Sequence, residues 1–436
     1  MVPKYQEDQT WKKLVTVSGV CSYWRNTFLT TPSLWTKLNG RGIEKTRAWV
    51  RRSKGLPIQL EAETSPDLQV LKFLAPHFSR LDVVILPSLK VRDRSLIAHN
   101  HLAKLLRPNP LLRVLRVDAS NLETFDAPVV VGGDFPSLES LYVAGAQMVF
   151  TDLHTPKLRD AYIAGEFDLT NLLDFIEVSP LLEHLALKLD PLQDMSLDTP
   201  RKVVMGKMES LRVFHHGSKI LQHLSLPPGG DIKMIEAISP DQLNGTTDIH
   251  AKLLSHALDN LPMTRRAESL SFHTTGTDAC RFVSLQGPDG TLEMLTNEIP
   301  IPAACVTLLR LFAQHSFWSI RDLKITNFEL LPGDSHLVRD FVSSLGGLQS
   351  IVMHCTSASP WLSALGSNHC PRLQDLTFEH PPPWSADYHM FLRFAKDRSV
   401  ADIPIQRLDV VNHPEVPLDA AQIETLREYV RFVAWT

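Results

Sequence analysis

Histidine and cysteine, the side chains that most often bind transition metals, come close together near the C-terminal end of this sequence. His354-Cys355, His369-Cys370 and His380 share one short stretch. Structural zinc sites space their ligands as C-x2-4-C or H-x3-5-H, and no pair here has that spacing. Free cysteine packs like a small apolar side chain. We therefore expect core cysteines and surface histidines, with no metal site.

Covalent and cofactor chemistry leaves no local signature either. The sequence contains no GxSxG elbow, no GxxxxGK[ST] phosphate loop and no GxGxxG after a strand. A triad of residues distant in the sequence stays open, because its members need only meet in space. We expect a protein that is not an enzyme and that carries no cofactor.

The composition narrows the class of protein further. The 436 residues are 44% hydrophobic and 21% charged, with a formal charge of -4. That charge is too close to neutral for a nucleic-acid or membrane-surface binder. The five cysteines are scattered without a CxxC pair, which favours a reducing compartment. With no apparent leader or membrane-spanning run, we expect a cytoplasmic or nuclear protein.

One short phrase recurs through most of the chain: an apolar residue, two others, an apolar residue, one other, an apolar residue. Its last two anchors alternate as one face of a strand does. The intervals leave room for a helix and two loops, so we expect an α/β solenoid. The phrases are Phe78-Leu81-Val83, Leu112-Leu115-Val117, Leu138-Leu141-Val143, Leu158-Ala161-Ile163, Leu182-Leu185-Leu187, Leu221-Leu224-Leu226, Ala267-Leu270-Phe272, Ile320-Leu323-Ile325, Leu348-Ile351-Met353, Leu373-Leu376-Phe378 and Ile405-Leu408-Val410.

Several segments between the phrases have helical periodicity. They cover residues 170–178, 248–261, 302–314 and 337–345, and Ile423, Leu426, Val430 and Val433 predict a terminal capping helix. Around Gly287-Pro288-Asp289-Gly290, the flanking residues 280–286 and 291–296 predict a strand pair.

The N-terminal region predicts a different element. Leu14, Val17, Cys21, Trp24 and Phe28 form one apolar stripe at helical spacing. Pro32 ends the helix at Thr31, and Leu34 and Trp35 follow on a short connector. A helix this short needs a partner surface for its stripe.

A basic segment follows, from Lys37 to Lys54, whose cations face a single acid, Glu44. One interpretation is a contact with an acidic partner. The other, which we favour, is a solvated helix face whose long stems cover apolar surface.

The pattern VCxxWR, followed by TPxLW and by Leu56-Pro57-Ile58-Gln59-Leu60, resembles the second half of an F-box, especially in F-box-like proteins of mushroom-type fungi. An F-box usually opens with an LPxE helix, and here only MVPKYQEDQT precedes Trp11, so we expect the module in residues 1–63 to be incomplete. The resemblance implies docking on the Skp adaptor, and thereby on the cullin scaffold, of an SCF ubiquitin ligase. The contact residues that it implies are Val20, Cys21, Trp24, Leu34 and Trp35.

Residues 64–436 resemble the irregular leucine-rich repeats that follow fungal F-boxes. The asparagine expected three residues after the last anchor is replaced by Ser120, Ala146, Phe328, Pro381 and His413, so we expect a distorted arc. The implied function is substrate recognition for the ligase, and the alternative is a repeat scaffold with no link to ubiquitin. An unknown target protein would bind residues that flank the strand anchors on the concave face, for example Arg116, Asp118, Tyr142, Lys188 and Thr377.

Overall fold

A computed structural model describes most of the chain. The described residues are 16, 19–62, 68–86, 107–118, 129–166, 168–189, 201–214, 218–221, 223–227, 229–237, 266–274, 281–297, 306, 309–310, 312–315, 317–326, 334–354, 358–366, 369–379, 388–411 and 419–435. They fall into two compact units, one of residues 1–183 and 192–197, the other of residues 184–191 and 198–436. We call them unit 1 and unit 2.

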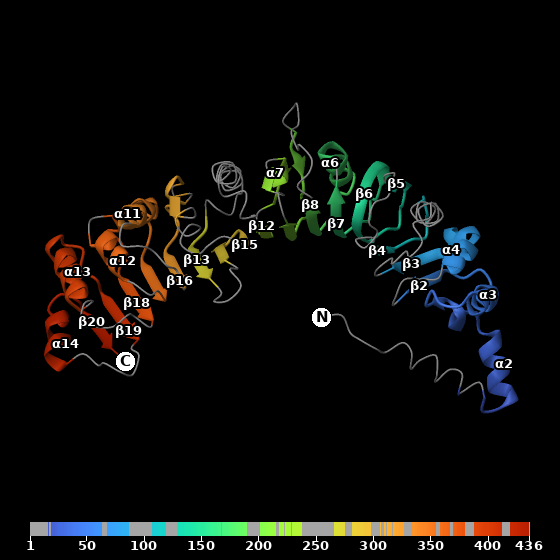
Figure 1. Cartoon of the computed structure of the whole chain (residues 1–436), viewed down its shortest axis with the longest axis horizontal. Coiled ribbons are helices and arrows are strands. Elements are labelled where there is room, and N and C mark those ends of the chain that lie inside the picture. The colour runs from blue at the N-terminus through green and yellow to red at the C-terminus, as the bar shows by residue number, and fades with distance from the viewer. Residues whose placement is uncertain are drawn as a thin grey trace. The chain divides into compact units, whose positions relative to one another are not determined.

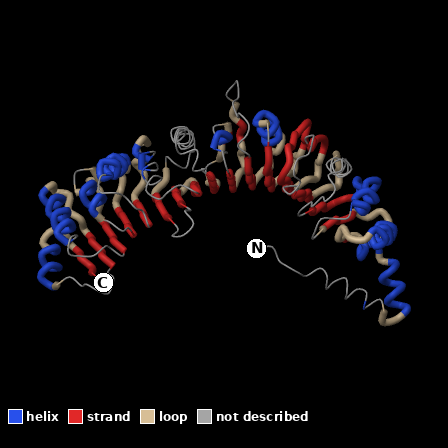
Figure 2. Tube along the Cα trace, viewed as in Figure 1, coloured by secondary structure: helices blue, strands red, loops and turns tan. Residues whose placement is uncertain are grey.

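Unit 1 is a parallel sheet with helices on one side of its strands (Figures 1 and 2). Strands β1, β2, β3, β4, β6 and β7 pair in that order, all parallel, and β5 pairs with the far half of β6. The elements are α2 (Ser22–Thr30), the 3-10 helix η1 (Pro32–Trp35), β1 (Lys37–Leu38), α3 (Ile43–Arg52), β2 (Ile58–Glu61), α4 (Leu68–Leu74), η2 (Ala75–Arg80), β3 (Leu81–Leu86), β4 (Val114–Asp118), β5 (Val129–Asp134), β6 (Ser140–His154), β7 (Asp160–Glu166) and α6 (Leu169–Glu177).

Unit 2 repeats the arrangement with one interruption. Its strands pair in the order β8, β10, β12, β15, β14, β13, β16, β17, β18, β19, β20, and only β13–β14 and β14–β15 are antiparallel. The elements are β8 (His184–Leu189), β9 (Val203–Val204), β10 (Ser210–Phe214), α7 (Ser218–Leu221), β11 (Leu224–Ser225), β12 (Asp231–Ala237), β13 (Ser269–Thr274), β14 (Arg281–Gly287), β15 (Gly290–Asn297), β16 (Asp322–Thr326), α11 (Ser335–Ser344), β17 (Ser350–His354), α12 (Ser359–Leu365), β18 (Asp375–Glu379), α13 (Tyr388–Val400), β19 (Arg407–Val411), α14 (Ala420–Arg427) and β20 (Phe432–Trp435).

The recurring phrase builds both units in the same way. The first anchor closes a tight turn by donating its N–H to the carbonyl three residues earlier, as Leu112 does to Asn109 and Leu348 does to Leu345. The last two anchors point into the core, as Leu115 and Val117 do at 1% and 0% exposed. Helices cover those anchors from the same side, so the residues between anchors stay on the open face of the sheet.

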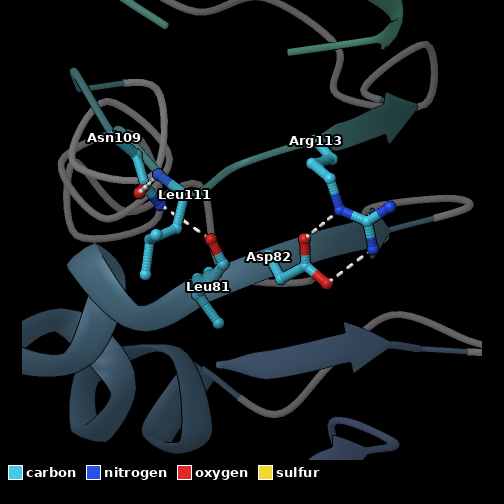
Figure 3. Close-up of polar contacts among 5 residues, drawn as sticks. All are labelled: Leu81, Asp82, Asn109, Leu111 and Arg113. Atoms are coloured by element: carbon cyan, nitrogen blue, oxygen red, sulfur yellow. Dashed lines mark hydrogen bonds and ion pairs between the residues drawn. The ribbon is translucent and has the colours of Figure 1, made fainter. Parts of the chain in front are cut away.

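A side chain reinforces the turn before β4 (Figure 3). The Asn109 amide donates to the carbonyls of Phe78 (2.7 Å) and Leu81 (3.0 Å), and its oxygen accepts the N–H of Leu111 (3.0 Å). These bonds hold β4 in register beside β3, because they bridge the entries of both strands.

Beside this turn, Arg113 donates two hydrogen bonds to the Asp82 carboxylate, at 2.6 and 2.9 Å (Figure 3). These bonds and the Arg113 charge hold the pKa of Asp82 below its usual value, although partial burial works against them. The pair joins neighbouring strands at their entry and so fixes the side chains further along β4.

Several predicted elements are confirmed. The α/β class is correct, and the helices predicted for residues 170–178 and 337–345 are α6 and α11. The predicted strand pair is the hairpin of β14 and β15 around Pro288-Asp289. Residues 248–261 lie outside the described residues, as do parts of 302–314 and four of the five positions expected to replace the asparagine ladder. The fifth, Ala146, lies where the pairing of β6 with β7 shifts.

Two of the predicted phrases are wrong in register or place. Pairing with β4 aligns Val84 with Leu115 and Leu86 with Val117, so the β3 phrase is Leu81-Val84-Leu86, three residues later than predicted. The error arises because the four residues from Val83 to Leu86 are all apolar, so either alternate pair could face the core. Residues Leu224 and Ser225 form β11, which pairs with β9 alone in a separate small sheet.

The strand that β11 was expected to provide comes earlier. Strand β10 pairs with β8 through Leu211 and Val213, and Met208 closes the turn before it. Met208, Leu211 and Val213 have the spacing of the predicted phrase, but the prediction assigned the strand to Leu221-Leu224-Leu226 instead.

Both ends of the chain also differ from the prediction. Helix α2 begins only at Ser22, because a turn at Gly19 and Val20 and the extended φ of -156° at Cys21 precede it. The terminal helix α14 ends at Arg427, and Val433 belongs to strand β20, where β-branched and aromatic residues favour extended backbone. The expected boundary after residue 63 is not a break in the sheet, since β2 pairs with β3 across it.

Candidate functional site

The exposed apolar side chains of α2 and its flanks form the first candidate site. Val20 is 69% exposed, Tyr23 73%, Trp24 50% and Leu34 37%. Tyr23 and Trp24 are neighbours in the first turn of α2, where their rings meet edge to face at 6.2 Å, and Val20 lies in the turn just before the helix. We call these four residues the N-terminal apolar surface. The predicted burial of the whole stripe is therefore wrong for the described residues, of which Phe28 alone is buried.

Trp35 holds this surface to unit 1 but does not belong to it. Its ring is 1% exposed, packs on Phe28 at 4.5 Å, and donates its Nε1–H to the Phe28 carbonyl at 3.0 Å. Of the five residues expected to contact the adaptor, Val20, Cys21, Trp24 and Leu34 are accessible, whereas Trp35 is a core residue. Sequence reasoning missed Tyr23, which lies next to the predicted stripe.

In the basic segment from Lys37 to Lys54, long cationic side chains cover apolar surface, as the favoured interpretation expected. The Arg52 guanidinium stacks over the Trp35 ring at 4.4 Å, and the Lys45 ammonium lies 5.2 Å from the Trp49 ring. Arg47 bonds to Glu44 at 2.7 Å. Arg52 and Lys45 thus cover the aromatic rings of Trp35 and Trp49.

A second candidate site lies on the open face of the unit 1 sheet. Register places Arg116, Tyr142 and Tyr162 side by side on β4, β6 and β7. The Arg116 guanidinium lies 4.5 Å from the Tyr142 ring, which stacks on Tyr162 at 4.3 Å with the planes 7° apart. We call these three residues the tyrosine row.

Asp118 completes the electrostatics of the tyrosine row. Burial raises the pKa of Tyr162, and the neighbouring Tyr142 and the Asp118 carboxylate raise it further. The Tyr162 phenol therefore stays protonated at neutral pH and lies close to a guanidinium and a carboxylate. Tyrosine and arginine supply much of the binding energy at protein interfaces, so this row is equipped to contact a protein.

The predicted target-binding residues are brought together only in part. Arg116, Asp118 and Tyr142 meet as described, whereas Lys188 and Thr377 lie in unit 2, on the nonadjacent strands β8 and β18. Tyr162 was missed although it lies between the anchors Ala161 and Ile163, as Tyr142 lies between Leu141 and Val143. Applying the flanking rule to every phrase would have found it.

The histidine and cysteine stretch is structural where it is described. Cys370 is 1% exposed, and its thiol donates to the Val342 carbonyl at 3.4 Å. Burial raises its pKa to about 12. His369 shares a hydrogen bond with Ser343, while Cys355 and His380 lie outside the described residues.

No protein-family model matches this sequence, and a search of curated proteins found no match either. Within the described parts of the chain, none of the helices has the length and apolar character that crossing a bilayer requires.

Proposed function

We propose that this chain is a non-enzymatic substrate-recognition subunit of an SCF-type ubiquitin ligase. Its F-box-like segment would dock on the Skp adaptor, and its sheets would be irregular leucine-rich repeats that bind a target protein. The observation that carries the proposal is the exposure of Val20, Trp24 and Leu34, which occupy the positions that the F-box resemblance assigns to the adaptor. Large apolar side chains exposed close together in the sequence mark a candidate interaction site.

In this mechanism the chain makes and breaks no covalent bonds. Adaptor contact through the N-terminal apolar surface would join it to the cullin scaffold. Contact through the tyrosine row would hold a target near the ubiquitin-loaded enzyme and raise its effective concentration there. Arg116, Tyr142 and Tyr162 support the second contact, since their side chains stack on one another from neighbouring strands.

The rival function is a repeat scaffold with no link to ubiquitin. Burial of Trp35 favours it, because one of the five residues implied by the resemblance is not accessible to an adaptor.

Adaptor binding separates the two functions. We would immobilise the Skp adaptor and measure binding of the full chain, of the Trp24→Ala, Leu34→Ala double variant, and of Trp318→Ala. Trp318 is 70% exposed in unit 2 and so matches Trp24 in chemistry but not in place. Loss of two hot-spot contacts should weaken binding by roughly a hundredfold, and Trp318→Ala should leave it unchanged. Absence of binding by the unmutated chain would exclude the ligase function in favour of the scaffold.

A further inference from the structure

A hollow of about 560 Å³ opens at the C-terminal end of the unit 2 sheet. Arg407 and Asp409 on β19 line it, together with Arg427 at the end of α14 and Arg431, Phe432, Val433 and Ala434 on and before β20. Figure 1 shows β19, β20 and α14 together at this end of the unit. It is separate from both sites described above.

The floor of the hollow is the open face of the last two strands. Register pairs Arg407 with Phe432 and Asp409 with Ala434. Phe432 is 60% exposed, which is unusual for a phenylalanine in a strand. The small side chain of Ala434 leaves the space above it empty, so the floor can accept a side chain from outside.

The wall of the hollow is cationic. Three arginines, Arg407, Arg427 and Arg431, face the single carboxylate of Asp409. Asp409 accepts a 2.7 Å bond from Arg407, and Glu424 outside the wall holds Arg427 at 2.6 Å. The Arg431 guanidinium lies 5.4 Å from the Phe432 ring, and Arg431 also lines the hollow. An anionic partner is therefore the one that this wall favours.

Strand β20, beside the hollow, has backbone N–H and C=O groups along the edge that faces away from β19. Among the described strands β20 pairs with β19 alone, and the Phe432 N–H donates to Gln406 at 2.9 Å. Backbone groups alternate between the two edges of a strand, so those of Val433 and Trp435 point away from β19. Edges of this kind are templates for an added strand.

We propose that β20 and its arginine-lined hollow bind an extended, acidic peptide segment of a partner protein, which adds to the sheet as a strand. Backbone hydrogen bonds at Val433 and Trp435 would give affinity, and carboxylates of alternate residues would meet Arg427 and Arg431. This site does not depend on the ligase function, since it lies in unit 2 and involves no residue of the N-terminal apolar surface.

The test is the affinity of the full chain for a short blocked peptide of alternating glutamate and valine, measured by fluorescence anisotropy. We expect binding that Arg431→Glu weakens by about tenfold and that added salt also weakens. Arg393→Glu is the matched control, because Arg393 is 84% exposed on α13 in the same unit. A second peptide, of alternating lysine and valine, tests the role of charge. Three results would overturn the proposal: equal losses of affinity in both variants, equal affinity for the two peptides, or no binding of the glutamate–valine peptide at all.

Strand addition has its own control. Val433→Pro removes a backbone N–H that points away from β19, so it should spare the sheet and abolish peptide binding. A peptide with alternate N-methylated amides should also fail to bind, without any change in the protein. Retained binding in both cases would contradict strand addition. Concentration-dependent self-association that Val433→Pro abolishes would make a second copy of the chain the occupant, and would likewise contradict the proposal.

Discussion

A single buried cation, Arg398, joins several loops around α12, β18 and α13 in unit 2. Arg398 on α13 is 0% exposed and donates to the carbonyls of Leu365 (3.1 Å), Cys370 (3.0 Å), Leu373 (3.2 Å) and Ile403 (3.1 Å). Desolvation lowers its pKa, and the ring of carbonyl dipoles offsets that cost. The guanidinium thus ties the entry of β18 to α12 and α13.

Replacing Arg398 by methionine should therefore unfold unit 2 at markedly lower urea concentration. The change removes the guanidinium donors of four carbonyls, of which that of Cys370 keeps the N–H of Leu373, at a cost of about 3–5 kcal/mol. Arg393→Met on the exposed face of the same helix is the control, and it should shift the free energy of unfolding by less than about 0.5 kcal/mol. Equal transitions for the two variants would show that the buried network contributes nothing.

The thiol beside this network should be chemically inert. Because the pKa of Cys370 is about 12, almost none of it is thiolate at neutral pH, and its sulfur is buried. Cys21 is exposed and serves as an internal comparison within the same chain. Iodoacetamide labelling followed by peptide mass spectrometry should show Cys370 reacting at least about a hundredfold more slowly, until urea removes the difference. Comparable rates in the native chain would mean that Cys370 is accessible.

At the scale of elements, the hairpin of β14 and β15 depends on one glycine. Gly290 has a φ of +118°, and a Cβ there would collide with the carbonyl oxygen of Gly230. The carbonyl of Asp289 in the same turn accepts the N–H of Gly229 at 2.6 Å, so the turn anchors the loop before β12. The β14–β15 hairpin therefore needs a residue without a Cβ at position 290 to pack against the loop before β12.

Gly290→Ala should lower the free energy of unfolding by about 2 kcal/mol, from backbone strain together with the collision. Gly206→Ala offers the comparison, because a Cβ at Gly206 would meet nothing within 4 Å. We expect that control to change stability by less than about 0.5 kcal/mol in the same thermal melts. A Gly290→Ala chain as stable as Gly206→Ala would refute this role of the turn.

How far the sequence predicted these elements depends on whether one hydrophobic pattern dominated. Phrases such as Leu373-Leu376-Phe378 gave the right strand, since polar neighbours leave one burial phase. The apolar run of β3 allowed two phases, and only pairing of Val84 with Leu115 decides between them. Likewise the stripe of α2 predicted a helix but not its exposure, because tertiary contacts bury Phe28 against Trp35 and leave Trp24 outside.

The candidate sites show the same limit. The flanking rule found Arg116 and Tyr142, but their stacking follows from the parallel register of β4 and β6, which local periodicity does not determine. The edge of β20 was not predicted at all. Ile423, Leu426, Val430 and Val433 fit a helical stripe, yet the chain turns after Arg427 and extends to pair with β19.

In the whole molecule, two of the three proposed binding surfaces lie in unit 1 and the third lies in unit 2. The N-terminal apolar surface on unit 1 would hold an adaptor, and the tyrosine row would hold a target. Strand β20 and its arginine-lined hollow, in unit 2, would bind an acidic peptide segment. The central claim concerns the first of these, because the ligase function stands or falls with it.

Hydrogen–deuterium exchange of the full chain, with and without the Skp adaptor, tests that claim most directly. We expect the backbone amides of α2 and η1, from Ser22 to Trp35, to exchange more slowly when the adaptor is bound, and those of α13 to exchange at an unchanged rate. The Trp24→Ala, Leu34→Ala variant should lose that protection. No protection of α2 and η1 at saturating adaptor, or protection confined to other segments, would contradict the account.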